Sequence, residues 1–317
     1  MSEPEKTPPA NWERAVLEKL ALSAIQEQRR SRHWSILFKT LGFLYLFIVL
    51  FMVSGWIGGD GVALPKEHTA LIDLQGVIAS DEASADTIIS SLQGAFEDKK
   101  TKGVILRINS PGGSPVQAGQ IYDEIKRLRA KYPKVPLYVV VDDICASGGY
   151  YVAVGADKIF VDKASIVGSI GVLMDGFGFT QTMEKLGVER RLLTAGENKG
   201  FLDPFSPVDP KQQAYAKQML EEIHGQFIAV VREGRGKRLK ETPETFSGLV
   251  WSGEKSIELG LADGLGSVES VARDVIKAED IVDYTQQASF AERLAGRLGA
   301  SMAQAWSPFE KAGVNLR

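Results

Sequence analysis

The chain has 317 residues, of which 44% are hydrophobic and 24% are charged, a composition ordinary for a folded domain with appendages. Its net charge of −3 at pH 7 gives no reason to expect a nucleic-acid partner, and the one basic cluster, residues 232–240, contains no aromatic side chain. The single cysteine, Cys145, excludes an internal disulfide and any metal site built from several cysteines.

An apolar run near the N-terminus is long enough to cross a membrane. No residue from Leu41 to Ile57 is charged, and with the preceding turn the run reaches about 20 residues, enough for ~30 Å of hydrocarbon. The run starts far from Met1 and no A-x-A cleavage site follows it, which argues against a cleaved signal peptide. We therefore expect an N-terminal tail over residues 1–34 and a transmembrane helix over residues 35–57.

The charges around this run predict its orientation. Four basic residues precede or open it: Arg29, Arg30, Arg32 and Lys39. Because basic residues favour the cytoplasmic side of a membrane, the N-terminal tail should be cytoplasmic and everything after Gly58 should lie outside the cytoplasm. A linker over residues 58–67 would then lead into an extracytoplasmic domain.

Residues 68–285 alternate between apolar strands and helical patterns. Strands are expected at residues 69–78, 102–110, 135–141, 157–162 and 188–194, and helices at 85–98, 114–132 and 209–232. Residues 252–270 have the pattern of a helix, a short strand and a second helix. This alternation predicts an α/β fold with a mainly parallel sheet, in which functional groups gather at the carboxyl ends of the strands.

The C-terminal segment, residues 286–317, is set apart from this domain. Within it, residues 289–306 form an amphipathic pattern. Such a helix could be a subunit contact, a membrane-surface helix or the last core helix, and the sequence does not separate these three.

The motif "DDICASGGYY", which begins at Asp142, has the features of a nucleophile turn. It places Ser147 between small residues where a strand passes into a helix, and small neighbours allow a tight turn and close approach by a substrate. The N–H of Gly148, next after the serine, would be the natural second donor to an oxyanion. A second motif, "NSPGGSP", also follows a strand, and its paired glycines can point N–H groups into a cleft. Alone this second motif is compatible with an ordinary turn, but the two together supply a nucleophile and two donors.

The base for such a serine is not evident among the three histidines. His33 precedes the membrane run, His68 directly follows the linker, and His224 lies inside a long helix, where a packed histidine is the ordinary interpretation. No zinc-binding or P-loop motif occurs, so we expect neither a metal nor another cofactor. A lysine can act instead when burial lowers its pKa from ~10.4 towards neutrality. Lys199, in a loop of small and apolar residues, is the candidate, although a loop lysine alone is a weak signal.

Three long motifs carry a resemblance to a known family. "INSPGGSP", "DDICASGGYYVAVGADKIFVDKASIVGSIGVLMDGFGF" and "LLTAGENKGFLDPFSP" resemble the short, single-unit form of the bacterial signal peptide peptidase A (protease IV) family. The resemblance implies that Ser147 is the nucleophile and Lys199 the general base, with Ser169 holding the lysine amine. It also implies that Gly113 and Gly148 supply the oxyanion donors.

The same resemblance implies a Clp protease/crotonase-like fold and a homo-oligomer in which the lysine can come from a neighbouring subunit. The expected function is a serine peptidase with a Ser–Lys dyad, anchored in the bacterial inner membrane with its catalytic domain in the periplasm. Its expected partners are signal peptides and other unfolded apolar peptides. Two alternatives remain: an acyl-CoA hydratase or isomerase of the crotonase type, and a non-catalytic membrane scaffold that keeps the protease fold.

Overall fold

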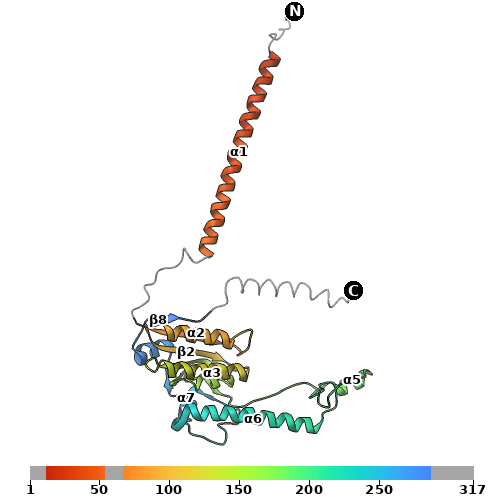
Figure 1. Cartoon of the computed structure of the whole chain (residues 1–317), viewed down its shortest axis with the longest axis vertical. Helices are drawn as coiled ribbons and strands as arrows, with labels where there is room; N and C mark the ends of the chain where they lie inside the picture. The colour runs from red at the N-terminus through yellow and green to blue at the C-terminus, as the bar shows by residue number, and fades with distance from the viewer. Residues whose placement is uncertain (1–11, 54–66, 287–317) are drawn as a thin grey trace, which may run out of the picture. The chain divides into compact units, whose positions relative to one another are not determined.

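The computed structural model describes residues 12–53 and 67–286, and the chain divides into two units, residues 1–64 and 65–317 (Figure 1). The described part of the first unit is one continuous helix, α1 (Trp12–Val53). In the described residues, one segment, residues 26–50, is long and apolar enough to cross a membrane. It overlaps the span expected at residues 35–57.

Parts of several predictions lie outside the described residues. These parts are residues 1–11 of the tail, the last four residues of the expected span, nearly all of the 58–67 linker, and the C-terminal amphipathic segment after Gln286.

The second unit is built on an eight-stranded, mostly parallel sheet with the strand order β6-β5-β3-β2-β1-β8, to which β4 and β7 add beside β3. Every pairing in the described sheet is parallel except that of β5 with β6. The α/β class with a mainly parallel sheet is therefore confirmed. The strands are β1 (His68–Gln75), β2 (Thr101–Ser110), β3 (Leu137–Ala146), β4 (Lys158–Val161), β5 (Ile166–Gly168), β6 (Val250–Ser252), β7 (Gly264–Leu265) and β8 (Ile281–Asp283).

The helices cover the two faces of this sheet unequally. Alternate strand residues such as Leu106 and Val139 join the main core, which the apolar faces of α2, α3, α4 and α6 complete. The intervening residues Ile105 and Val140 pack against a small cluster from α8 and η2. The helical elements are α2 (Ala85–Glu97), α3 (Pro115–Lys131), α4 (Gly148–Ala153), α5 (Thr180–Leu186), α6 (Pro210–Arg235), α7 (Gly253–Glu258), α8 (Val268–Ser270), and the short turns η1 (Gly236–Arg238) and η2 (Val271–Ile276).

Side-chain caps fix where the main helices begin. Ser114 accepts a hydrogen bond from the Gln117 N–H at the start of α3, and Pro115 occupies the first turn, where its missing N–H is not needed. Asp209 caps α6 in the same way, as its position before Pro210 predicted. The helix of α3 therefore starts directly after the paired glycines of the "NSPGGSP" loop.

The strand predicted over residues 188–194 is wrong. This segment lies in an arm, residues 172–208, which carries α5 and projects from the body of the unit (Figure 1). A strand requires a partner for its backbone N–H and C=O groups, and this projecting segment pairs with no strand of the described sheet. The apolar residues 192 and 193 that suggested a strand are exposed there.

Candidate active site

Three neighbouring strands end at the same edge of the sheet and bring three loops together. Because β5, β3 and β2 are adjacent and parallel, their carboxyl ends meet at one edge. Gly113 follows β2, Ser147 follows β3, and Ser169 follows β5. The topology thus gathers four of the five predicted site residues, with Gly148 beside Ser147.

The backbone at Ser147 has the strain expected of a presented nucleophile. Its φ of 51° and ψ of −122° lie outside the regions that non-glycine residues prefer, which costs about 1–3 kcal/mol. The surroundings hold this conformation, since the Ser147 N–H donates to the Gly168 carbonyl at 2.9 Å. Ser147 is the N-cap residue of α4, yet its side chain makes no capping hydrogen bond. Its hydroxyl is therefore not engaged by the helix that follows it.

The glycine loop after β2 presents an N–H group towards the same place. Ile78 donates to the Gly112 carbonyl at 2.8 Å and accepts from the Ser114 N–H at 2.8 Å. Because successive residues of an extended chain point their backbone groups in opposite directions, this pairing turns the N–H of Gly113 away from Ile78. A Cβ atom built on Gly148 would lie 3.2 Å from the Gly113 nitrogen, so the two glycine backbones are neighbours.

Both loop glycines occupy positions that no other residue could fill without movement. A Cβ atom on Gly112 would lie 2.7 Å from the Gly148 nitrogen and 2.7 Å from the Ser147 Cβ. One on Gly113 would lie 2.3 Å from the Ile78 carbonyl oxygen, and both glycines have positive φ. The arrangement suits a pair of N–H donors that stabilise an oxyanion formed at Ser147.

A cavity of about 690 Å³ opens in front of Ser147. Gly113, Gly148 and Ser169 line it together with Ser147, and its remaining walls are largely apolar. The apolar lining comes from α4, from the start of the arm and from one face of α6: Tyr151, Val172, Leu173, Met174, Met219, Leu220, Ile223 and Phe227. Such a cavity can bury an apolar side chain of an extended peptide beside the serine.

Two titratable side chains near the serine remain neutral. Burial raises the pKa of the Cys145 thiol and that of the Tyr150 phenol, and both side chains are fully buried. The Tyr150 hydroxyl donates to the Leu261 carbonyl at 2.8 Å. Neither group can therefore serve as the base, and Cys145 is a buried packing residue.

Lys199 is not among the residues that line this cavity. It lies in the arm, where its backbone N–H closes a turn onto the Gly196 carbonyl at 3.1 Å, and it is exposed. Phe201, two residues after Lys199, packs edge-on against Tyr215 of α6. Within one subunit, the structure thus brings together Gly113, Ser147, Gly148 and Ser169 and leaves Lys199 apart from them.

The described histidines of this unit have other partners. His68, at the opposite end of β1 from the site, is fully buried, and its Nε2 lies 3.0 Å from the Tyr284 hydroxyl. The Nε2 atom of His224 lies 3.1 Å from the Ile170 carbonyl oxygen, and His224 is not among the lining residues. The described residues contain no cluster of three His, Cys, Asp or Glu side chains that could hold a metal.

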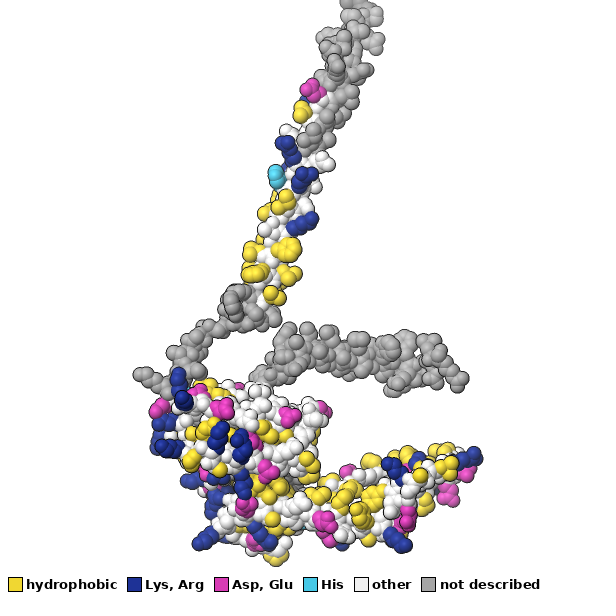
Figure 2. Space-filling view, viewed as in Figure 1, with side chains coloured by type: hydrophobic (Ala, Val, Ile, Leu, Met, Phe, Trp, Pro, Cys, Tyr) yellow, Lys and Arg dark blue, Asp and Glu magenta, His cyan; other side chains and the backbone are white. Residues whose placement is uncertain are grey.

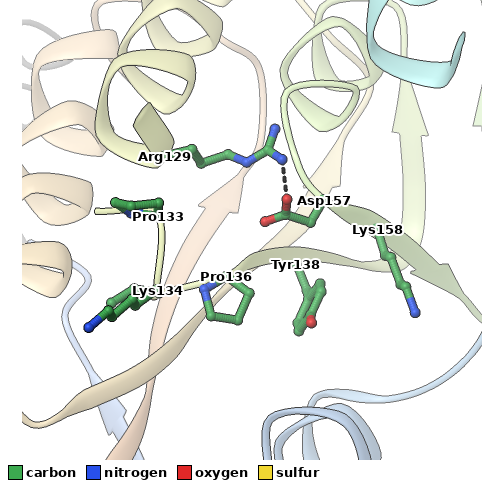
Figure 3. Close-up of a pocket in the computed structure, with 8 residues that line it drawn as sticks. Arg129, Pro133, Lys134, Pro136, Tyr138, Asp157 and Lys158 are labelled. Carbon is green, nitrogen blue, oxygen red and sulfur yellow. Dashed lines mark hydrogen bonds and ion pairs between the residues drawn. The ribbon is translucent and has the colours of Figure 1, made fainter. Parts of the chain in front are cut away.

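A second cavity, of about 580 Å³, lies at the amino ends of β3 and β4 (Figure 3). Arg129 and Asp157 form an ion pair across it, and the Asp157 carboxylate also accepts the Leu137 N–H at 2.9 Å. These bonds join α3 to the start of two strands. The cavity contains no nucleophile beside a base and lies at the edge of the sheet opposite Ser147.

Sequence reasoning missed two contributors to the site. The bridge from Ile78 to Gly113 and the contact from His224 to Ile170 both join segments far apart in the chain. No local pattern indicates such contacts, although the expected extension of the first strand to Ile78 was a partial signal.

Two family models match the chain: "Peptidase family S49" over residues 129–282 and "Clp protease" over residues 68–167. A protein of Methanocaldococcus jannaschii named "Putative protease MJ0651" is 32% identical over 66% of this chain and 68% of its own length. An Enterococcus faecium protein named "Putative signal peptide peptidase SppA" is 29% identical over 68% of this chain and 64% of its own length.

A Brucella melitensis protein named "Na(+)/H(+) antiporter NhaA" is 47% identical over 57% of this chain, yet the match spans only 25% of that protein. The chain therefore corresponds to about a quarter of the length of this relative.

Proposed function

Because the chain belongs to the S49 family of serine peptidases, we propose that it is a membrane-anchored endopeptidase in which Ser147 is the nucleophile and Lys199 the general base. The observation that carries the proposal is the strained backbone of Ser147 beside the paired glycine N–H groups, at the mouth of an apolar cavity. The family match favours this function over acyl-CoA chemistry on a related fold.

The proposed reaction uses each of these groups in turn. The Ser147 Oγ attacks the scissile carbonyl carbon while the neutral amine of Lys199 takes the hydroxyl proton. The N–H groups of Gly113 and Gly148 stabilise the oxyanion, and the lysine ammonium then gives its proton to the departing amine. A water molecule, deprotonated by the same lysine, attacks the acyl carbon, and the lysine ammonium returns that proton to the departing Ser147 Oγ as the acid product is released. Ser169 holds the amine in place throughout.

We further propose that the base comes from a neighbouring subunit of a homo-oligomer. Lys199 is exposed on the arm and does not line the cavity that contains Ser147, so a neighbouring subunit is the candidate to bring a lysine to that serine. The arm also exposes many apolar side chains (Figure 2). The most exposed are Leu173, Phe177, Leu186, Leu193 and Val208, each at least 68% exposed. An apolar surface of this kind is typical of a subunit contact.

The proposed substrates are signal peptides and other unfolded apolar peptides. The walls of the cavity are mostly apolar, which suits apolar side chains next to the scissile bond. An anchor within residues 26–50 would keep the enzyme at the membrane, where such peptides remain after cleavage from secreted proteins. The name of the Enterococcus faecium relative is consistent with this substrate class. The proposed orientation has a cytoplasmic N-terminus and a periplasmic catalytic domain.

Peptide hydrolysis by purified variants tests the proposal. Ser147→Ala and Lys199→Ala should each abolish cleavage of an apolar peptide, while Asp175→Asn, an exposed change elsewhere in the arm, should retain it. A serine-reactive phosphonate should label the wild type at Ser147. An unlabelled, inactive wild-type protein would favour the non-catalytic scaffold instead.

A further inference from the structure

The side chain of His224, on α6, contacts the segment that carries Ser169. Its Nε2 atom lies 3.1 Å from the carbonyl oxygen of Ile170. A carbonyl oxygen only accepts hydrogen bonds, so Nε2 carries the proton and donates it to Ile170. The Nε2 atom is therefore occupied as a donor and is not available to take a proton from a serine.

Residues 168–171 depend on a small number of bonds for their unusual conformation. Gly168 has a φ of 119° and Ser169 a φ of 53°, and such a backbone persists only where its surroundings hold it. The Gly168 carbonyl accepts the Ser147 N–H at 2.9 Å, the Ser169 N–H donates to the Leu249 carbonyl at 2.7 Å, and the Gly171 N–H donates to the Ser169 carbonyl at 2.9 Å. Besides these backbone hydrogen bonds, the segment receives one side-chain hydrogen bond, which His224 donates from α6.

The contact also joins the segment just before the arm to the middle of α6, the helix that follows the arm. The arm leaves the body of the unit directly after Gly171 and returns into α6, the helix that carries His224. The bond between Ile170 and His224 therefore ties the start of the arm to the helix, about half-way along α6. The same helix supplies Ile223 and Phe227 to the lining of the Ser147 cavity. The bond therefore also helps to fix the position of this cavity wall relative to Ser169.

We propose that His224 is a positioning residue that holds the Ile170 carbonyl and so keeps Ser169 in its place in the cavity that contains Ser147. The inference rests on the proposed function, since it assigns to His224 an indirect role in the same reaction. The imidazole acts only as a hydrogen-bond donor, and it exchanges no proton with substrate. Its Nε2 keeps a proton in both the neutral ring and the charged ring, so the contact does not depend on which of these forms is present.

A matched pair of substitutions separates a donor from a base. His224→Gln keeps an N–H group near the position of Nε2, whereas His224→Met has a similar length and no donor. Methionine suits the half-buried site, so the variant should fold, and its thermal unfolding midpoint checks this. His224→Glu, which also lacks a donor when ionised, is the second variant if methionine does not fold. Glu221→Gln, an exposed change on the same helix, is the control.

The kinetics of an apolar peptide then decide between the roles. We expect His224→Met to lower kcat by about 10- to 100-fold with little change in KM, because a small misplacement of a catalytic group is costly. His224→Gln should restore kcat to within about threefold of the wild type and keep the wild-type dependence of kcat/KM on pH, since the bond to Ile170 remains. Glu221→Gln should match the wild type.

Two results would overturn the inference. Wild-type kcat in a folded His224→Met would show that the contact positions nothing. Equal inactivity of folded His224→Gln and His224→Met, with loss of the ascending limb of the pH profile, would show that the ring is the base. Peptidase activity that survives in Ser147→Ala would instead refute the proposed function itself, which keeps the two failures distinguishable.

Discussion

Mixed oligomers should recover activity that neither of two inactive variants has alone. If Ser147 and Lys199 of one site come from neighbouring subunits, a subunit with Ser147→Ala still offers its lysine, and a subunit with Lys199→Ala still offers its serine. Each variant alone should lose about 10⁴-fold in kcat/KM, because the two groups act as a unit. In oligomers of equal, random composition, half of the serines and half of the facing lysines are intact. About a quarter of the sites should then be complete.

The structure gives the reason to expect this result. Lys199 lies in the exposed arm and outside the cavity that contains Ser147, so a single subunit holds the two groups apart. The assay is co-expression of the two variants with different affinity tags, sequential purification of mixed oligomers, and measurement of peptide hydrolysis. Mixing Ser147→Ala with the double variant Ser147→Ala/Lys199→Ala should restore nothing. Tag-verified mixed oligomers that remain as inactive as the single variants would refute the shared site.

Four further outcomes are expected. Gly113→Ala should lower kcat by about 10²–10³-fold with the fold retained. The added Cβ would lie 2.3 Å from the Ile78 carbonyl oxygen, so the loop has to shift and its N–H donor moves with it. A normal kcat would contradict the role of Gly113 as an oxyanion donor. Asp263→Asn should destabilise the domain by about 3–5 kcal/mol in chemical denaturation, since it leaves the buried Arg235 unpaired. Burial alone would raise the pKa of Asp263, but its bonds to Arg235 hold that pKa below its usual value. The stabilising contribution of Asp263 should therefore be present above about pH 4, the pKa range of an unfolded aspartate, and fall as the pH drops through the lowered pKa. A flat acid profile of stability would contradict this. Protease added to intact spheroplasts should digest the domain after Gly58. Protection of this domain would show that the proposed orientation is wrong.

The long elements of the fold could be predicted because each carries its own signal. The apolar runs of β2 and β3 and the capped start of α6 indicate their elements within a few residues. The short strands β5 and β6, of three residues each, could not be found in this way, because three residues show no periodicity. Yet β5 delivers Ser169 to the site.

The candidate site could be predicted in its parts but not in its assembly. Glycine and serine at a strand end are local features, so Gly113, Ser147 and Gly148 were expected to gather, and they do. The strand expected before Lys199 is wrong because an apolar run is not by itself evidence for a sheet. An apolar run shows that a surface has to be buried, and it does not show whether a sheet or another subunit covers it. The exposed arm favours another subunit.

The proposed division of the site between two subunits would couple activity to assembly. One subunit supplies the strained serine and the paired N–H groups at the ends of its strands, and the apolar cavity from α4, α6 and the start of the arm. In the proposed mechanism it lacks its base, because Lys199 is exposed on the arm and does not line the cavity. Covering the apolar arm with a second subunit would both bury the lysine, which favours its neutral form, and bring it to a serine. Assembly and activation are then one event, and an unassembled subunit would be a poor hydrolase even though its fold is complete.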